Sequence, residues 1–386
     1  MYPIKKLQDC ATIIAGQSPE SKYYNSTGEG IPFFQGKADF GELYPKVRVY
    51  CSSPTKIAQY NDILLSVRAP VGPTNLSPGT VCIGRGLAAI RPDDSLDLKY
   101  LLYYFRYFET QLSAKGTGTT FKAINQKLIK NLEIPIPPLN EQFRIVARIE
   151  ELFSELDKAV DTLKTTKEQL EVYRQAVLKE IFDSVSTTSV HIKDVCLDIK
   201  VGIVIKPTQY YVSENGVPAF RNANVRRGYI NDTDWVMISK EGHQQNCRSE
   251  VHTNDVLISR SGANLGMASV VPARYNGYNA IDVVIAVPDI SKVIPEFLAQ
   301  YTNSPMGRAI VKKNERGAAQ GHLNVSAYAN LPIGVPDLQE QEKLVKQISD
   351  RLSVCDSIEK TVDTALAQAD AMRQSILKQA FEEGSV

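Results

Sequence analysis

The chain carries two copies of one long segment, at residues 125–182 and 324–381, held at a constant offset of 199 positions. A repeat of this length constrains the fold more than any local pattern, because each copy is one folding unit. Two equal halves predict a molecule with internal pseudo-two-fold symmetry. The two copies share, without a gap, Asn125/Asn324, Asn131/Asn330, Leu132/Leu331, Pro137/Pro336, Leu139/Leu338, Glu141/Glu340, Gln142/Gln341, Asp157/Asp356, Arg174/Arg373, Leu178/Leu377 and Phe182/Phe381.

The second part of each copy has the pattern of a long amphipathic helix. Residues 139–182 contain no Pro and no Gly, and aliphatic residues recur there at a seven-residue step, which is the spacing of a coiled coil. The corresponding seam in the second copy is weaker because it includes Arg351 and several small residues, so we expect each helix to need the other. The residues predicted to pair the two helices are Ile149, Leu152, Leu156, Leu163, Leu170, Val177, Ile348, Ile358, Val362 and Ile376.

Proline-rich stretches mark the predicted helix starts. In the second copy, Asp337 and Glu340 have the spacing of a capping box. In the first copy Pro138 takes the place of Asp337, so Asn140 is the predicted cap.

The segments before the helices are predicted to be mixed α and β. Matching motifs, such as Gly30-Ile31-Pro32 and Gly216-Val217-Pro218, indicate one shared fold with loops of different length. We predict an α+β chain in the order globular domain (1–137), helix (138–186), globular domain (187–336) and helix (337–386). Apolar runs and periodicity predict strands at 31–35, 63–67, 80–83, 87–90, 217–220, 256–259, 268–271 and 280–287, helices at 98–112 and 295–312, and turn-rich loops at 116–120 and 316–322.

Length and composition narrow the class of protein. A chain of 386 residues fits two or three domains. It has no run of 18 apolar residues and no signal-peptide core, so we expect a cytoplasmic protein that spans no membrane. The six scattered cysteines, without a C-x-x-C motif, favour reduced thiols over a disulfide frame or a zinc site.

Charge is distributed unevenly along the chain. The net charge is +5 over residues 1–137 and +3 over 187–336, but −3 over 138–186 and −4 over 337–386. This pattern is compatible with a polyanion that lies on the globular parts and not on the helices.

Catalytic motifs are missing from the sequence. The four histidines do not cluster, and Gly116-Thr117-Gly118-Thr119-Thr120 lacks the lysine of a phosphate-binding loop. Asp93 and Asp97 could suggest a nuclease, but they are too close in sequence to reach one metal ion from separate strands. Ile136-Pro137-Pro138-Leu139 lacks the polar residue and the aromatic of an amino-methyltransferase motif. We therefore expect a chain that carries no chemistry of its own and binds no metal.

The repeated motif itself resembles a known family. Pro137-Pro138-Leu139-x-Glu141-Gln142 before a long helix, repeated as Pro336-x-Leu338-x-Glu340-Gln341, is similar to the specificity subunit of type I restriction-modification enzymes, over essentially the whole chain. The resemblance implies two target-recognition domains separated by two long antiparallel coiled-coil helices. Each domain would read one half of an asymmetric, split sequence in double-stranded DNA.

The same resemblance implies partners. Two methyltransferase subunits would bind this subunit, and two restriction-translocation subunits could join them. S-adenosylmethionine, ATP and magnesium would belong to those partners, which methylate adenine after extruding the base. The helix starts, including Glu141, Gln142, Arg144, Glu340 and Gln341, are candidates for docking the methyltransferase or are simply solvated.

Loops after the predicted strands carry the polar and basic side chains that DNA recognition needs. For any one of them, an ordinary surface or turn role is the alternative. In the first domain, the predicted DNA-binding residues are Gln35, Lys37, Arg68, Thr117, Thr119, Thr120 and Lys122. In the second domain they are Arg221, Asn222, Asn224, Arg226, Arg227, Arg260, Ser261, Asn264, Arg316, Gln320 and His322.

Three other interpretations remain open at the level of sequence. The chain could be a coiled-coil adaptor that binds protein rather than DNA, a small nuclease that uses Asp93 and Asp97, or the specificity subunit of a related system with fused methylase and nuclease. The aromatic residues at 100–108 could stack on bases, but their helical spacing favours packing in the core.

Overall fold

The structure is a computed structural model that describes residues 2–116, 123–309 and 322–383. The chain divides into two compact units. Unit 1 comprises Met1–Leu163 and Thr364–Val386, and unit 2 comprises Lys164–Asp363. The long helices α3 (Leu139–Asp183) and α8 (Leu338–Lys378) each contribute one end to either unit.

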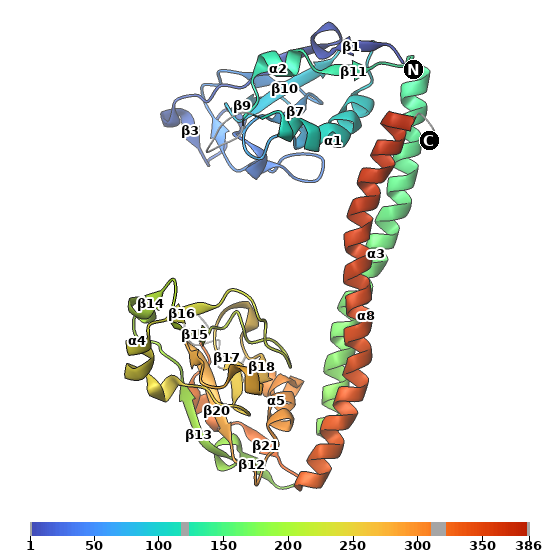
Figure 1. The fold of residues 1–386 in the computed structure, drawn as a ribbon. Helices are drawn as coiled ribbons and strands as arrows, with labels where there is room; N and C mark the ends of the chain where they lie inside the picture. Colours follow the sequence, from blue (N-terminus) through green and yellow to red (C-terminus); the bar gives the residue numbers. More distant parts are fainter. Residues whose placement is uncertain (1, 117–122, 310–321, 384–386) are drawn as a thin grey trace. The chain divides into compact units, whose positions relative to one another are not determined.

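Unit 1 is built around a four-stranded antiparallel sheet (Figure 1). A second sheet contains one parallel pair, β4 with β9, and a two-stranded sheet joins β1 to β11. In sheet order, the strands are β2 (Ala11–Ala15), β10 (Leu87–Pro92), β7 (Ile63–Ser66) and β8 (Thr74–Leu76), then β3 (Tyr24–Asn25), β5 (Tyr50–Cys51), β4 (Ile31–Phe34), β9 (Val81–Ile83) and β6 (Ile57–Ala58), then β1 (Ile4–Lys6) and β11 (Glu133–Pro135).

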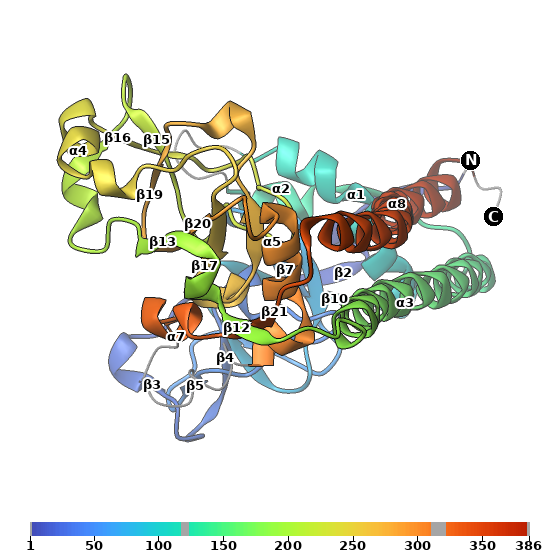
Figure 2. The ribbon, with the colours of Figure 1, turned by 90° about the horizontal axis from the view of Figure 1, so that it is seen from below.

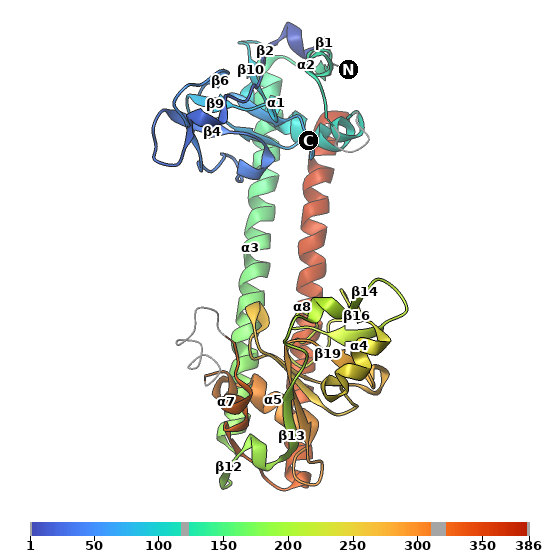
Figure 3. The ribbon, with the colours of Figure 1, turned by 90° about the vertical axis from the view of Figure 1, so that its left-hand side faces the viewer.

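The core of unit 1 lies between its main sheet and helix α1 (Leu98–Ala114). Tyr100 and Tyr104 of α1 are buried there, as their helical spacing predicted, and burial raises the pKa of Tyr104 to about 12. Helix α2 (Gln126–Lys130) follows, capped by Asn125, whose side chain accepts from the Leu128 amide at 2.8 Å. Helix α3 begins in this core and helix α8 ends in it, and Figure 3 shows both beside α1.

The main sheet of unit 2 has the same topology as that of unit 1. It runs β13–β20–β17–β18, which matches β2–β10–β7–β8 strand for strand, and helix α5 packs against β17 and β18. Figure 2 shows α5 beside β17. The strands are β13 (Cys196–Val201), β20 (Val283–Pro288), β17 (Val256–Ser259), β18 (Ala268–Val270), β14 (Tyr211–Val212), β16 (Val236–Ile238), β15 (Val217–Phe220), β19 (Asn279–Ala280), β12 (Ser189–His191) and β21 (Pro332–Gly334). The helices are α4 (Lys240–Gln245), α5 (Pro295–Asn303) and α7 (Val325–Ala329).

Short turns of 3₁₀ helix join several of these elements. They lie at Leu7–Asp9, Ser21–Tyr23, Lys37–Asp39, Ile192–Asp194, Pro207–Tyr210, Cys247–Ser249, Gly262–Asn264 and Ala273–Tyr275. A π-helical turn, Gln379–Glu383, follows α8.

The single helix predicted at 295–312 is interrupted. Helix α5 ends at Asn303, Ser304 adopts an extended backbone, and helical structure resumes at 305–309. The cause is Pro305, because a residue that precedes proline is disfavoured in the helical region. The strand predicted at 280–287 is likewise two strands, β19 and β20, separated by Asp282, whose φ is 53°.

The glutamine of the repeated Glu-Gln pair fixes helix α3 to the globular part of unit 1. The buried Gln142 side chain accepts a hydrogen bond from the Asp97 amide at 2.7 Å. It donates to the carbonyl oxygens of Ser95 and Pro137 at 3.0 and 2.8 Å. Both N–H groups of this amide and its oxygen are therefore bonded to the backbone just before α1 and α3.

Gln341 makes the same three bonds in unit 2. It accepts from the Ile294 amide at 2.8 Å and donates to the carbonyl oxygens of Lys292 and Pro336 at 2.9 and 2.8 Å. Because Gln142 and Gln341 are completely buried, the suggestion that they dock a partner from the outer helix face is wrong. The repeated glutamine is an internal tie between helix and domain.

The two long helices are capped differently, as the sequence suggested, but the cap of α3 is not the predicted residue. In unit 2 the Asp337 carboxylate accepts from the Glu340 amide at 2.8 Å, which confirms the cap. In unit 1 the predicted Asn140 cap is wrong, because α3 begins at Leu139 and the Pro138 carbonyl accepts from the Glu141 and Gln142 amides at 2.9 and 3.0 Å.

The segments of α3 and α8 within each unit run in opposite directions. In unit 2, Arg174 pairs with Asp356 at 2.7 Å, while residues further along α3 pair with residues nearer the start of α8. In unit 1, Arg373 pairs with Asp157. These two ion pairs join the same residue types at repeat-related positions, so each unit holds its helix segments by the same contact.

Most of the predicted pairing residues face inward. Ile358 does not, and it is 40% exposed, because Cys355 and Val362 occupy the buried side of that part of α8. Buried pairing residues are Ile149, Leu156, Leu170, Val177, Ile348 and Val362, and half-buried ones are Leu152, Leu163 and Ile376.

We predict that Gln142→Ala will lower the free energy of unfolding by about 2 kcal/mol, because the Asp97 amide and two carbonyls would lose their buried partner. Urea unfolding of the full chain measures the change. Gln169→Ala is the matched control, because Gln169 is an exposed glutamine on the same helix. An equal, small effect of both substitutions would contradict the role assigned to Gln142.

Candidate nucleic-acid interface

Three of the residues predicted to bind DNA line one cavity in unit 1. Gln35 and Lys37 follow strand β4, and Arg68 follows strand β7. The cavity has a volume of about 610 Å³. It is lined by Phe33, Gln35, Gly36, Lys37, Ala38, Asp39, Arg48, Val49, Ser66, Arg68, Ala69, Pro70, Arg85 and Gly86.

This cavity is strongly basic. Arg48 is neutralised by Asp39, whose Oδ1 accepts from the Arg48 Nε at 3.1 Å. In the part of the chain that the structure describes, no carboxylate forms an ion pair with Lys37, Arg68 or Arg85. Three exposed cations around an apolar floor would attract an anion, and their N–H groups can only donate hydrogen bonds.

Local backbone contacts bring these cations together. The Ser66 hydroxyl donates to the carbonyl oxygens of Arg68 and Pro70 at 3.1 and 2.8 Å, which folds the segment after β7. Gly86 lies so close to the end of β4 that an added Cβ would stand 2.3 Å from the Gln35 carbonyl oxygen. The glycine therefore permits the approach that places Arg85 beside Gln35.

Sequence reasoning missed Arg48 and Arg85. Arg85 had a usable signal, because it lies in a Gly-Arg-Gly turn between two apolar runs. Arg48 had none, since it lies in a long loop far from any predicted strand end. The predicted contacts Thr117, Thr119, Thr120 and Lys122 lie outside the described residues.

In unit 2, predicted DNA-binding residues from separate loops also meet, but they bond to one another. The Asn222 Oδ1 accepts from the Ser259 hydroxyl and the Arg260 amide at 3.0 and 2.8 Å. Its Nδ2 donates to the Ser261 hydroxyl at 2.8 Å, and Asn264 Nδ2 donates to the Asn222 carbonyl at 2.9 Å. Asn222 thus joins the loops after β15 and β17.

Asp282 completes this junction. Its Oδ1 accepts from Arg260 Nη1 at 3.0 Å, and its Oδ2 accepts from the Ser261 hydroxyl at 3.3 Å. Asp282 lies between β19 and β20, which correspond to β9 and β10 of unit 1. The turn between β9 and β10 carries Arg85. A carboxylate therefore occupies the region of unit 2 in which unit 1 has an exposed arginine.

One predicted DNA contact in unit 2 does not hold. Asn224 is completely buried, its Oδ1 accepts from the Arg221 amide at 2.9 Å, and its Nδ2 donates to the carbonyl oxygens of Asn231 and Thr233. Its short polar side chain shapes the turn instead of facing a groove. Arg221 donates to the Asp234 carbonyl at 2.6 Å but keeps part of its surface exposed.

The adjacent arginines of this loop face different surroundings. Arg227 forms an ion pair with Glu171 of helix α3, so its charge positions the loop against that helix. Burial and the neighbouring Arg227 lower the pKa of Arg308. Arg226 is half-buried and its Nη1 has no hydrogen-bond partner within the described residues.

His322 is exposed, whereas Arg316 and Gln320 lie outside the described residues.

The two aspartates of the nuclease alternative have structural roles. Asp97 caps α1 by accepting from the Tyr100 amide at 2.9 Å, and Asp93 accepts from the amide and hydroxyl of Ser95 at 2.9 and 2.7 Å. Among the described residues, no three His, Cys, Asp or Glu side chains gather in a group that could hold a metal ion. Every described helix is too short or too polar to span a membrane.

Comparison with known families matches both halves of the chain to one model. Residues 2–172 and 178–368 each match the type I restriction modification DNA specificity domain. The chain belongs to this family. Within the family, the two halves of the chain correspond to two successive specificity domains.

Relatives carry the same assignment in their names. The putative MjaX type I restriction enzyme specificity subunit of Methanocaldococcus jannaschii is 42% identical over 167 residues, which is 43% of this chain and 38% of that protein. The EcoBI specificity subunit of Escherichia coli is 25% identical over 75% of this chain and 66% of its own length. A crystal structure of the HsdS subunit from Thermoanaerobacter tengcongensis is 50% identical, with a TM-score of 0.37, over 40% of this chain and 37% of that one.

We predict that Asn222→Ala will lower the free energy of unfolding by about 1–3 kcal/mol, because Ser259, Arg260 and Ser261 would lose their hydrogen bonds to the Asn222 side chain. The urea midpoint of the full chain measures this loss. Gln244→Ala, which removes an exposed amide on α4, should leave the midpoint unchanged. A normal midpoint for Asn222→Ala would show that the junction does not hold the loops.

Proposed function

We propose that this chain is the DNA sequence-specificity subunit of a type I restriction-modification complex. Membership of the specificity-domain family supports this role. The observation that carries the proposal is one fold, present twice, with different side chains at the same loops. Such a chain is suited to reading two different half-sites, and hence an asymmetric bipartite target in double-stranded DNA.

Unit 1 would bind DNA through its basic cavity. Lys37, Arg68 and Arg85 can grip phosphates, or donate to the acceptor atoms that guanine presents in the major groove. Gln35 adds an amide that can both donate and accept. In unit 2, Arg260 would be held in a fixed pose by Asp282 while Arg221, Arg226 and Ser261 complete the surface.

The long helices would act as the spacer between half-sites. The recognition domains would comprise residues 1–137 and 187–336, and the spacer helices residues 138–186 and 337–386. We propose that α3 and α8 form an antiparallel coiled coil along their length, supported by the opposite directions of their paired segments within each unit. A rigid pair would fix the phase of one half-site relative to the other, as two-fold dimers do for palindromes.

The chemistry would belong to partner subunits. We propose that two methyltransferase subunits bind this subunit, that restriction-translocation subunits can join, and that S-adenosylmethionine, ATP and magnesium bind to those partners. This chain would contribute the target and the orientation, and the partner would extrude and methylate the adenine.

We predict that Arg68→Ala combined with Arg85→Ala will weaken DNA binding by the complex with its methyltransferase. If both arginines contact phosphates, the slope of log affinity against log salt should fall by about 2. Fluorescence anisotropy over a salt series measures both quantities. Arg148→Ala combined with Lys158→Ala removes the same charge from α3 and should leave the slope unchanged. Equal slopes for all variants would contradict the cavity as a DNA site.

We predict that replacing residues 187–323 by the equivalent part of another family member will change only one half of the methylated sequence. Methylome sequencing of cells that express the exchanged chain with its methyltransferase gives the answer directly. If both halves changed, the two domains would not read DNA separately. If no methylation depended on the chain, an adaptor role would replace the proposed one.

A further inference from the structure

The ion pairs between the two long helices are of two kinds. The pair Arg174–Asp356 in unit 2 recurs as Arg373–Asp157 in unit 1, at positions related by the repeat. Because each copy of the repeat supplies one aspartate and one arginine, this pair can form between any two such helices. It cannot distinguish one helix from the other.

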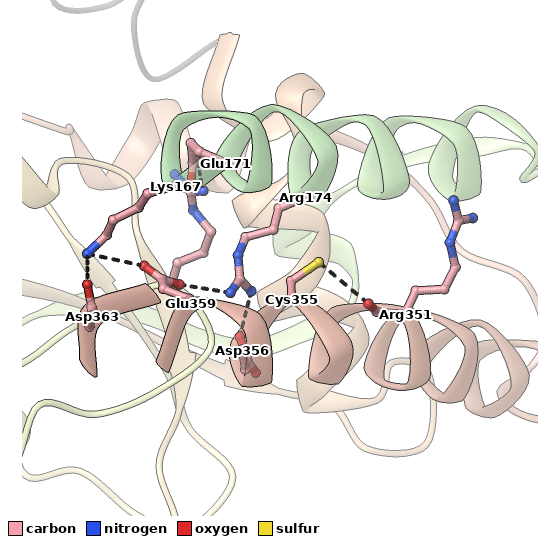
Figure 4. A network of polar contacts seen from close by, with 9 residues as sticks. Lys167, Glu171, Arg174, Arg351, Cys355, Asp356, Glu359 and Asp363 are labelled. Atoms are coloured by element: carbon pink, nitrogen blue, oxygen red, sulfur yellow. Dashed lines mark hydrogen bonds and ion pairs between the residues drawn. The ribbon is translucent and has the colours of Figure 1, made fainter. Parts of the chain in front are cut away.

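Other pairs in unit 2 join residue types that the repeat does not keep, and Figure 4 shows the first of them, between Lys167 and Asp363. Lys167 of α3 bonds to Asp363 at 2.7 Å and lies 3.8 Å from Glu359, both on α8. Arg351 of α8 makes two bonds of 3.0 Å to the carboxylate of Glu180 on α3.

The repeat-related residues could not form these bonds. Lys167 corresponds to Leu366 and Asp363 to Lys164, while Glu180 corresponds to Gln379 and Arg351 to Leu152. Every one of these charges is therefore present in one helix and missing or reversed in the other.

Pairing with a second copy of the chain would lose these bonds. If α3 paired with α3 of another copy in the same register, Lys167 would face Lys164 and Glu180 would face Leu152. If α8 paired with α8, Asp363 would face Leu366 and Arg351 would face Gln379. Each defect would occur twice, once on either side of the two-fold axis of such a dimer.

The buried seam differs between the helices in the same direction. Leu156, Leu163 and Leu170 of α3 correspond to Cys355, Val362 and Ala369 of α8, so large side chains in one helix correspond to smaller ones in the other. A pair of two α8 seams would leave voids that the α3 leucines fill, and voids in a close-packed seam cost stability.

We propose that the unrepeated ion pairs, together with the unequal seams, make α3 and α8 select each other and reject a second copy of the same chain. A single exposed ion pair contributes little, but several that are lost together, and twice over in each symmetric alternative, set a preference. The chain then remains a one-to-one pairing of its own helices. This selection goes beyond the proposed DNA function and does not depend on it.

Lys167→Glu tests the selection in the full chain. The substitution places a carboxylate at position 167, opposite Asp363 and Glu359 within the chain but opposite Lys164 in an α3–α3 dimer. Two differently tagged copies are co-expressed, one tag is captured, and the other tag is measured, with molar mass determined by light scattering. The wild-type chain should be monomeric, and Lys167→Glu should increase capture of the second copy by roughly tenfold.

Adding Asp363→Lys to Lys167→Glu should restore the monomer, because the new lysine again faces an acid within the chain. Lys179→Glu is the matched control, since Lys179 pairs with Asp183 on its own helix and takes no part in choosing a partner. A wild-type dimer, equal capture for Lys167→Glu and Lys179→Glu, or a loss of stability of Lys167→Glu without capture of a second copy would each overturn the proposal.

Discussion

The structure depends on one buried amide used twice. Gln142 and Gln341 each make three bonds to backbone groups at the point where a long helix leaves its globular unit. Apolar contacts alone would bury the helix end without fixing its direction, because the hydrophobic effect is not directional. An amide buried without partners is costly, so the helix is stable mainly in the orientation that satisfies all three bonds. The repeat thus preserves the direction in which each long helix leaves its unit, as well as the fold of that unit.

Around this fixed framework the loops have diverged. The main sheets of both units have the same strand order, but the loops differ in charge: Arg85 is an exposed cation at the cavity of unit 1, whereas Asp282 neutralises Arg260 in unit 2. The loop segments are free to vary because the sheets and the glutamine tie do not depend on them. Two recognition surfaces of different chemistry can then be carried by one scaffold, which is what an asymmetric target would require.

The framework was largely predictable from the sequence, and the loop chemistry only in part. The 199-residue offset, the heptad spacing and the aromatic helix depend on regular burial, which leaves a periodic signal. Asn224 and Gln142 were misjudged because a polar residue in a sequence looks available, whereas its backbone partners appear only in three dimensions. Pro305 did carry a local signal against a helix continuing to residue 312.

The same division between shared and unshared residues applies to the helices. Residues that the repeat keeps, such as Asp157 and Arg174 with their counterparts, support any antiparallel pairing and therefore preserve the architecture. Residues that the repeat has lost, such as Lys167 and Arg351, distinguish the permitted pairing from its symmetric alternatives. In a duplicated chain, either long helix could pair with the same helix of a second copy, because the two halves still resemble each other. Charge differences at exposed positions of the helices oppose this mispairing at little cost to stability, since exposed pairs contribute weakly to folding but differ in sign between pairings.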